Sequence, residues 1–429
     1  MSLLAKKYFH FIGIGGIGTS SLAQILHAKG KIISGSDNCA SELTENLKRN
    51  GIKAYPGHNA KNVTRKHQIV IYSPAIPANN PELQQAKKLK IPCLSYPEAL
   101  GELSKEYFTT AIAGTHGKST TTAMTSLILT AGKLDPTVVI GTKLREFKNK
   151  NFRVGKSKYL IIEACEYRRS FLHFQPKILV ITNIEVEHLD YYKDLEDYQK
   201  AFNELATRVP KDGYIIVHGL EKNLAPILKN CSAKIIKWKK TDLKIKPGIP
   251  GQFNVNNATN AAQVGQILGI GKSTIEKAIR QYKGSWRRLE YKKKKLGKTQ
   301  FIDDYGHHPT EVRVTLAAIR EQHPDTKILC VFQPHQYSRT KLLLKEFAYA
   351  FNAVDQVIIP NIYKVRDSDE DVKSMNVDML LSEIKKHQPH AKNGKSLEKT
   401  AEFIKKNHQK FDIIVTMGAG DISKIYKTL

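Results

Sequence analysis

The sequence predicts a parallel α/β fold that is divided into three domains. The chain has 429 residues, which is too long for one hydrophobic core and is typical of two or three domains. Short runs rich in β-branched residues alternate with longer amphipathic stretches, as in parallel βαβ units. Most of the short runs end in a polar or glycine-rich cluster, and we place the domains at residues 1–107, 108–286 and 287–429.

The expected strands follow this alternation through all three domains. In the first domain they cover residues 8–15, 31–37 and 67–76, and in the second residues 108–114, 158–164, 177–184 and 213–219. In the third domain they cover residues 299–306, 327–333, 356–362 and 411–421. Ligands of open α/β sheets bind at the carboxyl ends of the strands, so we expect each domain to present a site there.

The clearest functional motif is the segment 111–122, AIAGTHGKSTTT, which links an expected strand to an expected helix. Gly117 lets the backbone approach a ligand, Lys118 brings a cation to the β- and γ-phosphates, and the Ser119 hydroxyl can ligate Mg²⁺. The motif is shorter than G-x-x-x-x-G-K-[ST], because Ile112 stands where a glycine should open it. The alternative is a chance Gly-Lys-Ser, but the strand–loop–helix context favours ATP or a related polyphosphate. The residues expected around the phosphates are Gly114, Thr115, His116, Gly117, Lys118, Ser119 and Thr120.

A glycine turn follows the first expected strand and opens a second candidate site. Its members are Gly13, Gly15, Gly16 and Gly18. They match the spacing G-x-G-x-x-G, and Asp37 ends the next strand about 20 residues later, where an acid meets a ribose hydroxyl. Taken alone, the pattern indicates NAD, although any ligand with a diphosphate can use such a turn, and the remaining alternative is a tight turn without a ligand. Ser73, after the third strand, would close the same pocket.

Acidic residues and a histidine follow the strands that we expect beside the phosphate loop. Glu163 ends the strand at 158–164 and is placed to hold a metal ion. The segment after the strand at 177–184 contributes Asn183, Glu185, Glu187 and His188. His188 could ligate a metal or bind phosphate, although magnesium prefers oxygen ligands. The alternative is a charged loop in which the histidine only packs.

Composition limits the class of protein and its location. Hydrophobic residues make up 41% and charged residues 25% of the chain, as in ordinary globular proteins. No apolar run approaches the roughly 20 residues of a membrane span, and the first residues lack the layout of a signal peptide. The five cysteines show no C-x-x-C spacing, which is typical of reduced thiols in a cytoplasmic protein.

The net charge of +28 is carried mostly by lysines spread along the whole chain. The densest cluster is Lys292 to Lys295, and another covers Lys148 to Lys158. Base-stacking surfaces need several interleaved aromatic residues, whereas these two clusters contain only Phe152, so we do not expect a nucleic-acid partner. The lack of a long apolar run likewise gives no reason to expect membrane insertion. We favour a solvated lysine-rich surface, with attraction of phosphorylated substrates as the alternative.

The ordered motifs resemble those of the Mur ligases, the ATP-dependent amide-forming enzymes of peptidoglycan synthesis. The resemblance covers essentially the whole chain and rests on HFIGIGGIG, SGSD, YSPAI, GTHGKSTTTAM, TNIEVEHLDYY, FNVNNATNAA, RRLE, DDYGHHPTEV, FQPHQYSRT and MGAGDI. DDYGHHPTEV and the first glycine turn are typical of the branch that adds alanine and of its relative that recycles muramyl peptides. The resemblance implies a Rossmann-like domain at each end and a central mononucleotide-binding domain of the P-loop ATPase type.

The activity implied by this resemblance is the ligation of L-alanine to the lactyl carboxylate of UDP-N-acetylmuramate. ATP would activate the carboxylate as an acyl phosphate, and Mg²⁺ would accompany ATP. The close alternative is the recycling branch, which adds a whole tripeptide. An NAD-dependent oxidoreductase and a nucleic-acid-stimulated ATPase are unrelated alternatives. The expected partners are the two small-molecule substrates, and the expected assembly is a monomer or a homodimer.

The resemblance also implies roles for single residues. The nucleotide-sugar contacts are Gly13, Gly15, Gly16, Gly18, Asp37, Ser73, His116, Asn183 and Arg287. The ATP contacts, besides the phosphate loop, are Asn254, Asn257, Arg288 and Asp304, and the amino-acid contacts are Tyr305, His307 and Arg339. The metal ligands are Ser119, Glu163 and His188, with Glu163 and His188 at the family's second metal site. The catalytic residues are Lys118, His188, His307 and Arg339, and His307 either acts as the base for the amine or only orients alanine.

The chain departs from the family pattern at a few positions. Arg168 and Arg169 occupy a segment that is more acidic in better-known relatives, and Gln336 stands where some relatives have an arginine. Phe202 stands where several other Mur ligases have a carbamylated lysine, which agrees with the alanine-adding branch.

Overall fold

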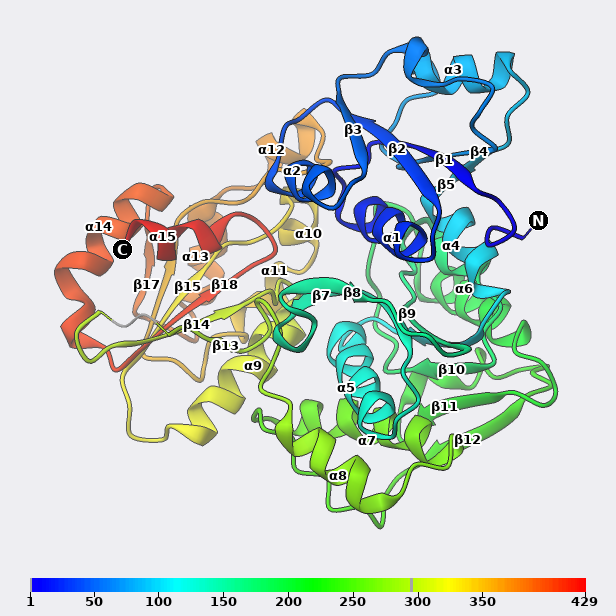
Figure 1. The fold of residues 1–429 in the computed structure, drawn as a ribbon. Helices are drawn as coiled ribbons and strands as arrows, with labels where there is room; N and C mark the ends of the chain where they lie inside the picture. Colours follow the sequence, from blue (N-terminus) through cyan, green and yellow to red (C-terminus); the bar gives the residue numbers. More distant parts are fainter. Residues whose placement is uncertain (1, 294–295) are drawn as a thin grey trace. The chain divides into compact units, whose positions relative to one another are not determined.

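The computed structural model describes residues 2–293 and 296–429, so Lys294 and Lys295 of the expected lysine cluster lie outside the described residues. The chain forms two compact units. Unit 1 comprises the chain up to Lys246 together with Asn256–Arg280, and unit 2 comprises Pro247–Val255 together with Gln281–Leu429. Two of the three sheets belong to unit 1 and the third belongs to unit 2 (Figure 1).

The first sheet of unit 1 has five parallel strands in the order β3-β2-β1-β4-β5. The strands are β1 Tyr8–Ile12, β2 Ile32–Asp37, β3 Lys53–Pro56, β4 Ile69–Tyr72 and β5 Cys93–Ser95. The helices are α1 Ile17–Ala28, α2 Glu42–Arg49, α3 Pro81–Lys88 and α4 Tyr96–Ser104. The central strand β1 is buried on both faces, as an apolar run between two parallel neighbours predicts.

The second sheet of unit 1 has seven strands in the order β12-β11-β10-β6-β9-β7-β8. The strands are β6 Phe108–Ala113, β7 Thr137–Leu144, β8 Lys150–Arg153, β9 Tyr159–Glu163, β10 Ile178–Ile181, β11 Tyr214–His218 and β12 Lys234–Trp238. The helices are α5 Lys118–Ala131, α6 Leu195–Thr207, α7 Gln252–Ile267 and α8 Lys272–Gln281. Strand β6 pairs in parallel with both β9 and β10, so the segments that follow these three strands meet at one edge.

Unit 2 contains a six-stranded sheet in the order β13-β14-β18-β15-β16-β17, in which β13 runs antiparallel to β14. The strands are β13 Glu290–Tyr291, β14 Gln300–Asp304, β15 Ile328–Phe332, β16 Gln356–Ile359, β17 Ala391–Asn393 and β18 Ile413–Met417. The helices are α9 Pro309–Gln322, α10 Tyr337–Leu342, α11 Leu344–Ala348, α12 Asp369–Ser374, α13 Val377–Ile384, α14 Leu397–Asn407 and α15 Ile425–Thr428. Strands β14, β18 and β15 are adjacent and parallel, so their carboxyl ends also lie side by side.

One hydrophobic cluster extends through both sheets of unit 1. Helix α4 joins them by packing against a short 3₁₀ segment at Tyr167–His173. The fit is tight, because a Cβ atom at Gly101 of α4 would lie 2.5 Å from the backbone oxygen of His173. A side chain at this position would therefore separate the helix from the segment.

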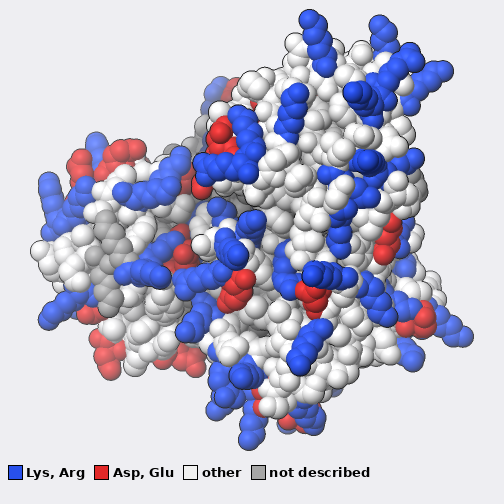
Figure 2. All heavy atoms as spheres, viewed as in Figure 1, with Lys and Arg blue, Asp and Glu red and all other residues white. Residues whose placement is uncertain are grey.

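The basic residues do not gather into one patch on the face shown in Figure 2, where Lys and Arg side chains lie scattered over both units. This distribution agrees with the solvated lysine-rich surface favoured by the sequence. Among the helices of residues 2–293 and 296–429, none combines the length and the apolar character that a membrane span needs.

The α/β class and the expected strands are confirmed. Most of the additional strands in the described residues are short edge strands, namely β3, β5, β8, β12, β13 and β17, which offer little of the buried apolar run on which the sequence prediction depends. The exception is β7, an internal strand with buried apolar residues at 138–140 that the sequence prediction missed. The domain bounds at 1–107, 108–286 and 287–429 stay a prediction.

Candidate active site

The phosphate loop lies between β6 and α5, at the edge where β6, β9 and β10 end. Two of its glycines have backbone conformations that other residues rarely adopt, with φ of 127° at Gly114 and 81° at Gly117. Space is also short, since a Cβ atom would lie 2.1 Å from the Thr182 hydroxyl oxygen at Gly114 and 2.3 Å from Asn257 Oδ1 at Gly117. The loop therefore needs glycine at both positions, and it delivers its backbone N–H groups to the start of α5.

The segment after β10 holds the loop in place through Thr115 and His116. The backbone N–H of Thr115 donates to the Asn183 carbonyl at 3.0 Å, and that of His116 donates to Asn183 Oδ1 at 2.9 Å. The Asn183 amide donates back to the His116 carbonyl at 3.0 Å. His116 Nε2 lies 3.1 Å from Glu185 Oε2. Asn183 and His116, both expected at the nucleotide sugar, thus also shape the phosphate loop.

Lys118 begins α5 and is held at the loop by three oxygen atoms. Its ammonium group donates to the backbone oxygens of Gly114 at 2.6 Å and Thr115 at 2.9 Å, and to Glu166 Oε1 at 2.9 Å. Burial acts to lower the pKa of Lys118, but the carboxylates of Glu166 and Glu187 outweigh it and raise that pKa. Lys118 is therefore a fixed cation that points into the loop.

Glu163 and His188, which were expected to share one metal site, lie beside different residues. Glu163, at the end of β9, accepts from the Ser119 hydroxyl at 2.9 Å and from the Gly141 backbone N–H at 2.6 Å. His188 instead faces Glu166, with 3.6 Å between Nε2 and Oε1. The structure thus joins Ser119 to Glu163 as expected, whereas the acid beside His188 is Glu166 rather than Glu163.

Glu166, Glu187 and His188 form a group whose ligand atoms all lie within 4.8 Å of one another. Glu166 Oε2 and His188 Nδ1 are buried, and in the described part of the chain neither atom has a hydrogen-bond partner. An unpartnered carboxylate oxygen that is buried beside a second carboxylate fits a bound divalent cation. His188 also has a positive φ of 57°, which is uncommon for a residue other than glycine.

The expected adenine contacts lie one turn apart on α7. Asn257 is buried beside the phosphate loop, where its Oδ1 accepts from the Thr121 hydroxyl at 3.3 Å. Asn254 is also buried and belongs to unit 2, where its side-chain amide donates to the Pro250 carbonyl at 2.6 Å. Thr120 is buried in the first turn of α5. The structure therefore brings Asn257 to the loop, while Asn254 caps the segment that enters the helix.

The N-terminal glycine turn closes around Asp37. The backbone N–H of Gly15 donates to Asp37 Oδ2 at 2.8 Å, and a Cβ atom at Gly15 would lie 2.9 Å from that oxygen. At Gly18, a Cβ atom would lie 2.7 Å from the ring of Tyr96. Ser73 borders the turn from the end of β4, because a Cβ atom at Gly13 would lie 3.1 Å from its Cβ. At Gly16, a Cβ atom would lie 2.8 Å from the Thr19 hydroxyl oxygen. The four glycines, Asp37 and Ser73 therefore lie together at the start of α1.

In unit 2, Asp304 and the two expected arginines lie where β14 ends. Asp304 is buried and accepts from the backbone N–H groups of Leu289 at 2.8 Å and Gly306 at 2.7 Å, and burial raises its pKa. Arg287 is 2% exposed. Its guanidinium donates to the carbonyls of Gly418 and Gly420 and lies 3.3 Å from Asp303 Oδ2. These partners give Arg287 a structural place inside unit 2. The guanidinium of Arg288 lies over the Tyr305 ring, 5.0 Å from its centroid.

The expected amino-acid contacts meet at the same edge of the unit 2 sheet. The ring of His307 lies 5.8 Å from that of Tyr305 and 5.7 Å from that of His335. Arg339 Nη1 lies 3.2 Å from His335 Nδ1. His335 thus links His307 to Arg339, although sequence reasoning did not name it. The sequence did contain two signals for it, because His335 belongs to the polar segment after β15 and to the family motif FQPHQYSRT.

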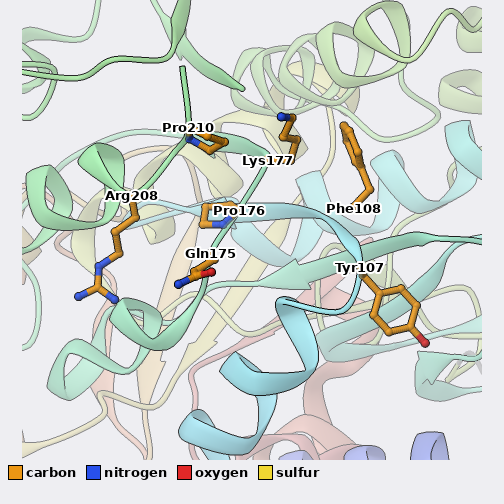
Figure 3. Close-up of a pocket in the computed structure, with 7 residues that line it drawn as sticks. All are labelled: Tyr107, Phe108, Gln175, Pro176, Lys177, Arg208 and Pro210. Atoms are coloured by element: carbon orange, nitrogen blue, oxygen red, sulfur yellow. The ribbon is translucent and has the colours of Figure 1, made fainter. Parts of the chain in front are cut away.

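A cavity of about 450 Å³ has no residue of the phosphate loop in its lining, which Figure 3 shows as sticks. Phe108 begins β6 and Lys177 precedes β10, so the cavity marks the amino ends of these strands. Its two cations are already paired, Lys177 with Asp212 and Arg208 with Glu204. We therefore place the chemistry at the opposite, carboxyl edge.

Comparison with family models covers all three sheets. The model of the Mur ligase family catalytic domain matches residues 8–108, that of the Mur ligase middle domain matches residues 112–239, and that of the Mur ligase glutamate ligase domain matches residues 287–420. Together the matched ranges include the glycine turn, the phosphate loop and the residues after β14.

Individual relatives are similar over nearly their whole length. The UDP-N-acetylmuramate–L-alanine ligase of Clostridium acetobutylicum is 40% identical, with 98% of this chain and 96% of the relative covered. The enzyme of that name from Acetivibrio thermocellus is 39% identical, with 98% and 94% covered.

Solved structures share the fold. The UDP-N-acetylmuramate–alanine ligase of Thermotoga maritima has a TM-score of 0.79 and 26% identity, with 99% of this chain and 98% of that chain covered. A murein peptide ligase from Psychrobacter arcticus has a TM-score of 0.71 and 21% identity, with the same coverage, and supports the fold alone. With three matching family models and relatives near 40% identity over almost the full chain, the protein belongs to the Mur ligase family.

Proposed function

We propose that this chain ligates L-alanine to the lactyl carboxylate of UDP-N-acetylmuramate and hydrolyses ATP to ADP and phosphate in the process. The observation that carries this proposal is the phosphate loop, in which the Lys118 ammonium donates to Glu166, a member of the group Glu166, Glu187 and His188. The relatives named above supply the substrate class, because they carry the name of this activity over nearly the whole length of the chain.

The first step activates the carboxylate, which is unreactive toward an amine at neutral pH. A lactyl carboxylate oxygen attacks the γ-phosphorus of ATP, the bond to the β,γ-bridging oxygen breaks, and ADP leaves. Such transfers depend on positioning and on charge stabilisation more than on covalent help from the protein. Lys118 is the fixed cation for this task, and the N–H groups at the start of α5 bind the phosphates.

Mg²⁺ is part of this proposal. Ser119 with Glu163 would hold one ion, and Glu166, Glu187 and His188 would hold another. When bound, the ions neutralise charge on the phosphates. The chain's own residues orient the loop: Glu166 fixes the Lys118 ammonium, and Asn183 fixes the backbone on either side of His116.

The second step forms the amide. The neutral amine of alanine attacks the acyl carbon, and the tetrahedral intermediate expels inorganic phosphate. Tyr305, His307 and Arg339 are proposed to hold alanine, with Arg339 facing its carboxylate. His307 either accepts a proton from the amine or orients it. His335, which lies between His307 and Arg339, joins this set on the geometry of unit 2.

The nucleotide sugar is proposed to bind at the glycine turn of Gly13, Gly15, Gly16 and Gly18. Helix α1 begins directly after this turn, so its N-terminal N–H groups suit a diphosphate. Asp37 accepts from the Gly15 backbone and keeps a second carboxylate oxygen near the turn for a ribose hydroxyl.

Location and assembly belong to the proposal as well. All five cysteines lie in the described part of the chain and are free, which supports a reducing, cytoplasmic setting. We propose a monomer or a homodimer that acts on small molecules and not on nucleic acid.

The test is phosphate release from ATP and Mg²⁺, with each substrate omitted in turn. Release that needs both UDP-N-acetylmuramate and L-alanine, with the product mass of the amide, is the expected result. Release with L-Ala-D-Glu-diaminopimelate but not with alanine would place the chain in the recycling branch. Release without any nucleotide sugar would overturn the proposal.

A further inference from the structure

A buried polar network lies behind the glycine turn and has no part in the chemistry described above. Its centre is Glu82 in the first turn of α3, and the side chains of Glu82, His10 on β1 and Ser36 on β2 are all 0% exposed. The other members lie on β2 and on the segment between β3 and β4: Ser34, His58, Asn59, Asn62 and His67. These residues come from four segments of the chain, so folding alone brings them together.

A continuous series of hydrogen bonds connects His67 to Glu82. The Thr64 backbone N–H donates to His67 Nδ1 at 3.0 Å, so the other ring nitrogen of a neutral His67 carries the proton and donates to Ser34 Oγ at 3.1 Å. Ser34 Oγ also lies 2.9 Å from His10 Nδ1, and His10 Nε2 donates to Glu82 Oε2 at 3.4 Å. Hydrogen bonds thus connect His67, Ser34 and His10 to the buried carboxylate.

Glu82 is a buried carboxylate whose two oxygens accept hydrogen bonds from four donors. Oε1 accepts from the Asn62 amide at 2.6 Å and from the Asn59 backbone N–H at 3.2 Å, while Oε2 accepts from the Ser36 hydroxyl and from His10. Burial acts to raise the pKa of Glu82, but the hydrogen bonds outweigh it and lower that pKa to about 2. Glu82 is therefore an anion at neutral pH, and a neutral amide in its place would leave donors without an acceptor.

Ser36 connects this network to the glycine turn. Its hydroxyl donates to Glu82 and accepts from His58 Nδ1 at 2.8 Å. Its backbone carbonyl accepts from two N–H groups at the start of the turn, that of Gly13 at 2.9 Å and that of Ile14 at 3.0 Å. The next residue in the chain is Asp37, which accepts from Gly15. The position of Ser36 therefore sets the position of both sides of the turn.

We propose that Glu82 is a positioning residue for the nucleotide sugar, because it anchors Ser36 and thereby fixes the glycine turn in its binding shape. This inference rests on the proposed function, since it assigns the glycine turn to the nucleotide sugar. A preformed turn avoids the cost of ordering the loop on binding. Removal of the Glu82 carboxylate should therefore weaken the binding of the nucleotide sugar without changing the ATP site.

The test compares steady-state kinetics of the wild type with those of Glu82→Gln and Ser36→Ala. Glu82→Gln keeps the shape of the side chain but replaces one acceptor oxygen by a donor. Ser36→Ala keeps the backbone carbonyl and removes the hydroxyl that bonds to Glu82 and His58. We expect each variant to raise the KM for UDP-N-acetylmuramate about tenfold, which corresponds to about 1.4 kcal/mol. The KM for ATP and kcat should change less than about threefold, because unit 1 keeps its phosphate loop.

Glu45→Gln is the matched control, since it removes the same charge from an exposed side chain of the same sheet domain, where Glu45 pairs with Lys48. Its KM values should equal those of the wild type. A loss of folded enzyme would lower kcat and leave every KM unchanged, so a uniform fall in kcat would overturn the inference. Unchanged KM values for UDP-N-acetylmuramate in both Glu82→Gln and Ser36→Ala would overturn it too. A wild type that needs no nucleotide sugar would instead overturn the proposed function.

Discussion

Removing the charge of Glu166 tests whether the phosphate loop depends on a buried ion pair. The Lys118 ammonium lies 2.9 Å from Glu166 Oε1, and the two side chains are 14% and 1% exposed. At an effective dielectric constant of about 20, unit charges at this distance attract by about 6 kcal/mol. Part of this attraction offsets the cost of burying Glu166, and Glu187 still faces Lys118 after the change. We therefore expect Glu166→Gln to lower the free energy of unfolding by about 3 kcal/mol.

The measurement is chemical denaturation at neutral pH in the presence of a metal chelator and without nucleotide. Lys118→Met and the double variant Lys118→Met/Glu166→Gln complete a double-mutant cycle. Each single variant leaves one buried charge without its partner, whereas the double variant removes both charges. We expect the double variant to be more stable than the sum of the single losses predicts, by about 2 kcal/mol or more. Glu196→Gln is the control, because its partner Lys200 and Glu196 itself are both highly exposed, and it should cost less than about 0.5 kcal/mol.

Two results would refute this reasoning. A loss below about 1 kcal/mol in Glu166→Gln would mean that the pair contributes no more than an exposed one. Additive losses in the cycle would mean that Lys118 and Glu166 act independently, despite their distance.

The other predictions concern the loop, the metal group and the buried histidine. Lys118→Ala should reduce phosphate release to less than about a tenth, because the γ-phosphate loses its fixed cation; greater retention would remove Lys118 from the mechanism. His188→Ala should raise the Mg²⁺ concentration for half-maximal activity about tenfold or more, whereas an unchanged titration would exclude His188 as a ligand. Gly117→Ala should destabilise unit 1 by about 1–3 kcal/mol in thermal denaturation, because of the positive φ and the contact with Asn257; wild-type stability would contradict the geometry. Burial lowers the pKa of His67 from 6.5 to about 4, so the unfolded state binds its proton first, and stability should fall as the pH falls from about 6.5 through about 4. His67→Gln should flatten this part of the pH profile of the unfolding midpoint, and a profile like that of the wild type would show that another group titrates.

The phosphate loop could be predicted from sequence because all its determinants are local. A buried strand, two glycines with positive φ and a helix start occupy one short segment, and each leaves its own mark on the sequence. Strand order could be anticipated only in outline. The neighbours β9 and β10 bring Glu163 and Asn183 to the loop because parallel strands end at one edge.

The assignment of the acids could not be read from the sequence. Glu163 and Glu166 are three residues apart, and both follow the same strand. Two residues after Glu166 have a positive φ, Arg168 at 50° and Arg169 at 56°. Arginine rarely adopts this conformation, so the sequence does not predict it. The sequence therefore does not show that Glu166 lies beside His188 whereas Glu163 bonds to Ser119.

The network around Glu82 was missed for a different reason. Its members are distributed over more than seventy positions, from His10 to Glu82, with no fixed spacing between them. A buried glutamate at the start of a helix looks like an ordinary N-terminal acid, which is common at exposed helix starts. Only the fold shows that Glu82 is fully buried and that Ser36 joins it to the glycine turn.

The charges around Lys118 explain why the proposed function includes a divalent cation. Lys118 is one cation, whereas Glu163, Glu166 and Glu187 supply three carboxylates at the same edge of the sheet. A triphosphate that enters this edge adds further negative charge in a partly buried setting, where repulsion is stronger than in water. The N–H groups of α5 and Lys118 cannot balance all of these charges. The protein's own carboxylates therefore support the proposed cation, and Glu166 Oε2, which is buried and has no hydrogen-bond partner among the described residues, is the candidate ligand with the strongest support.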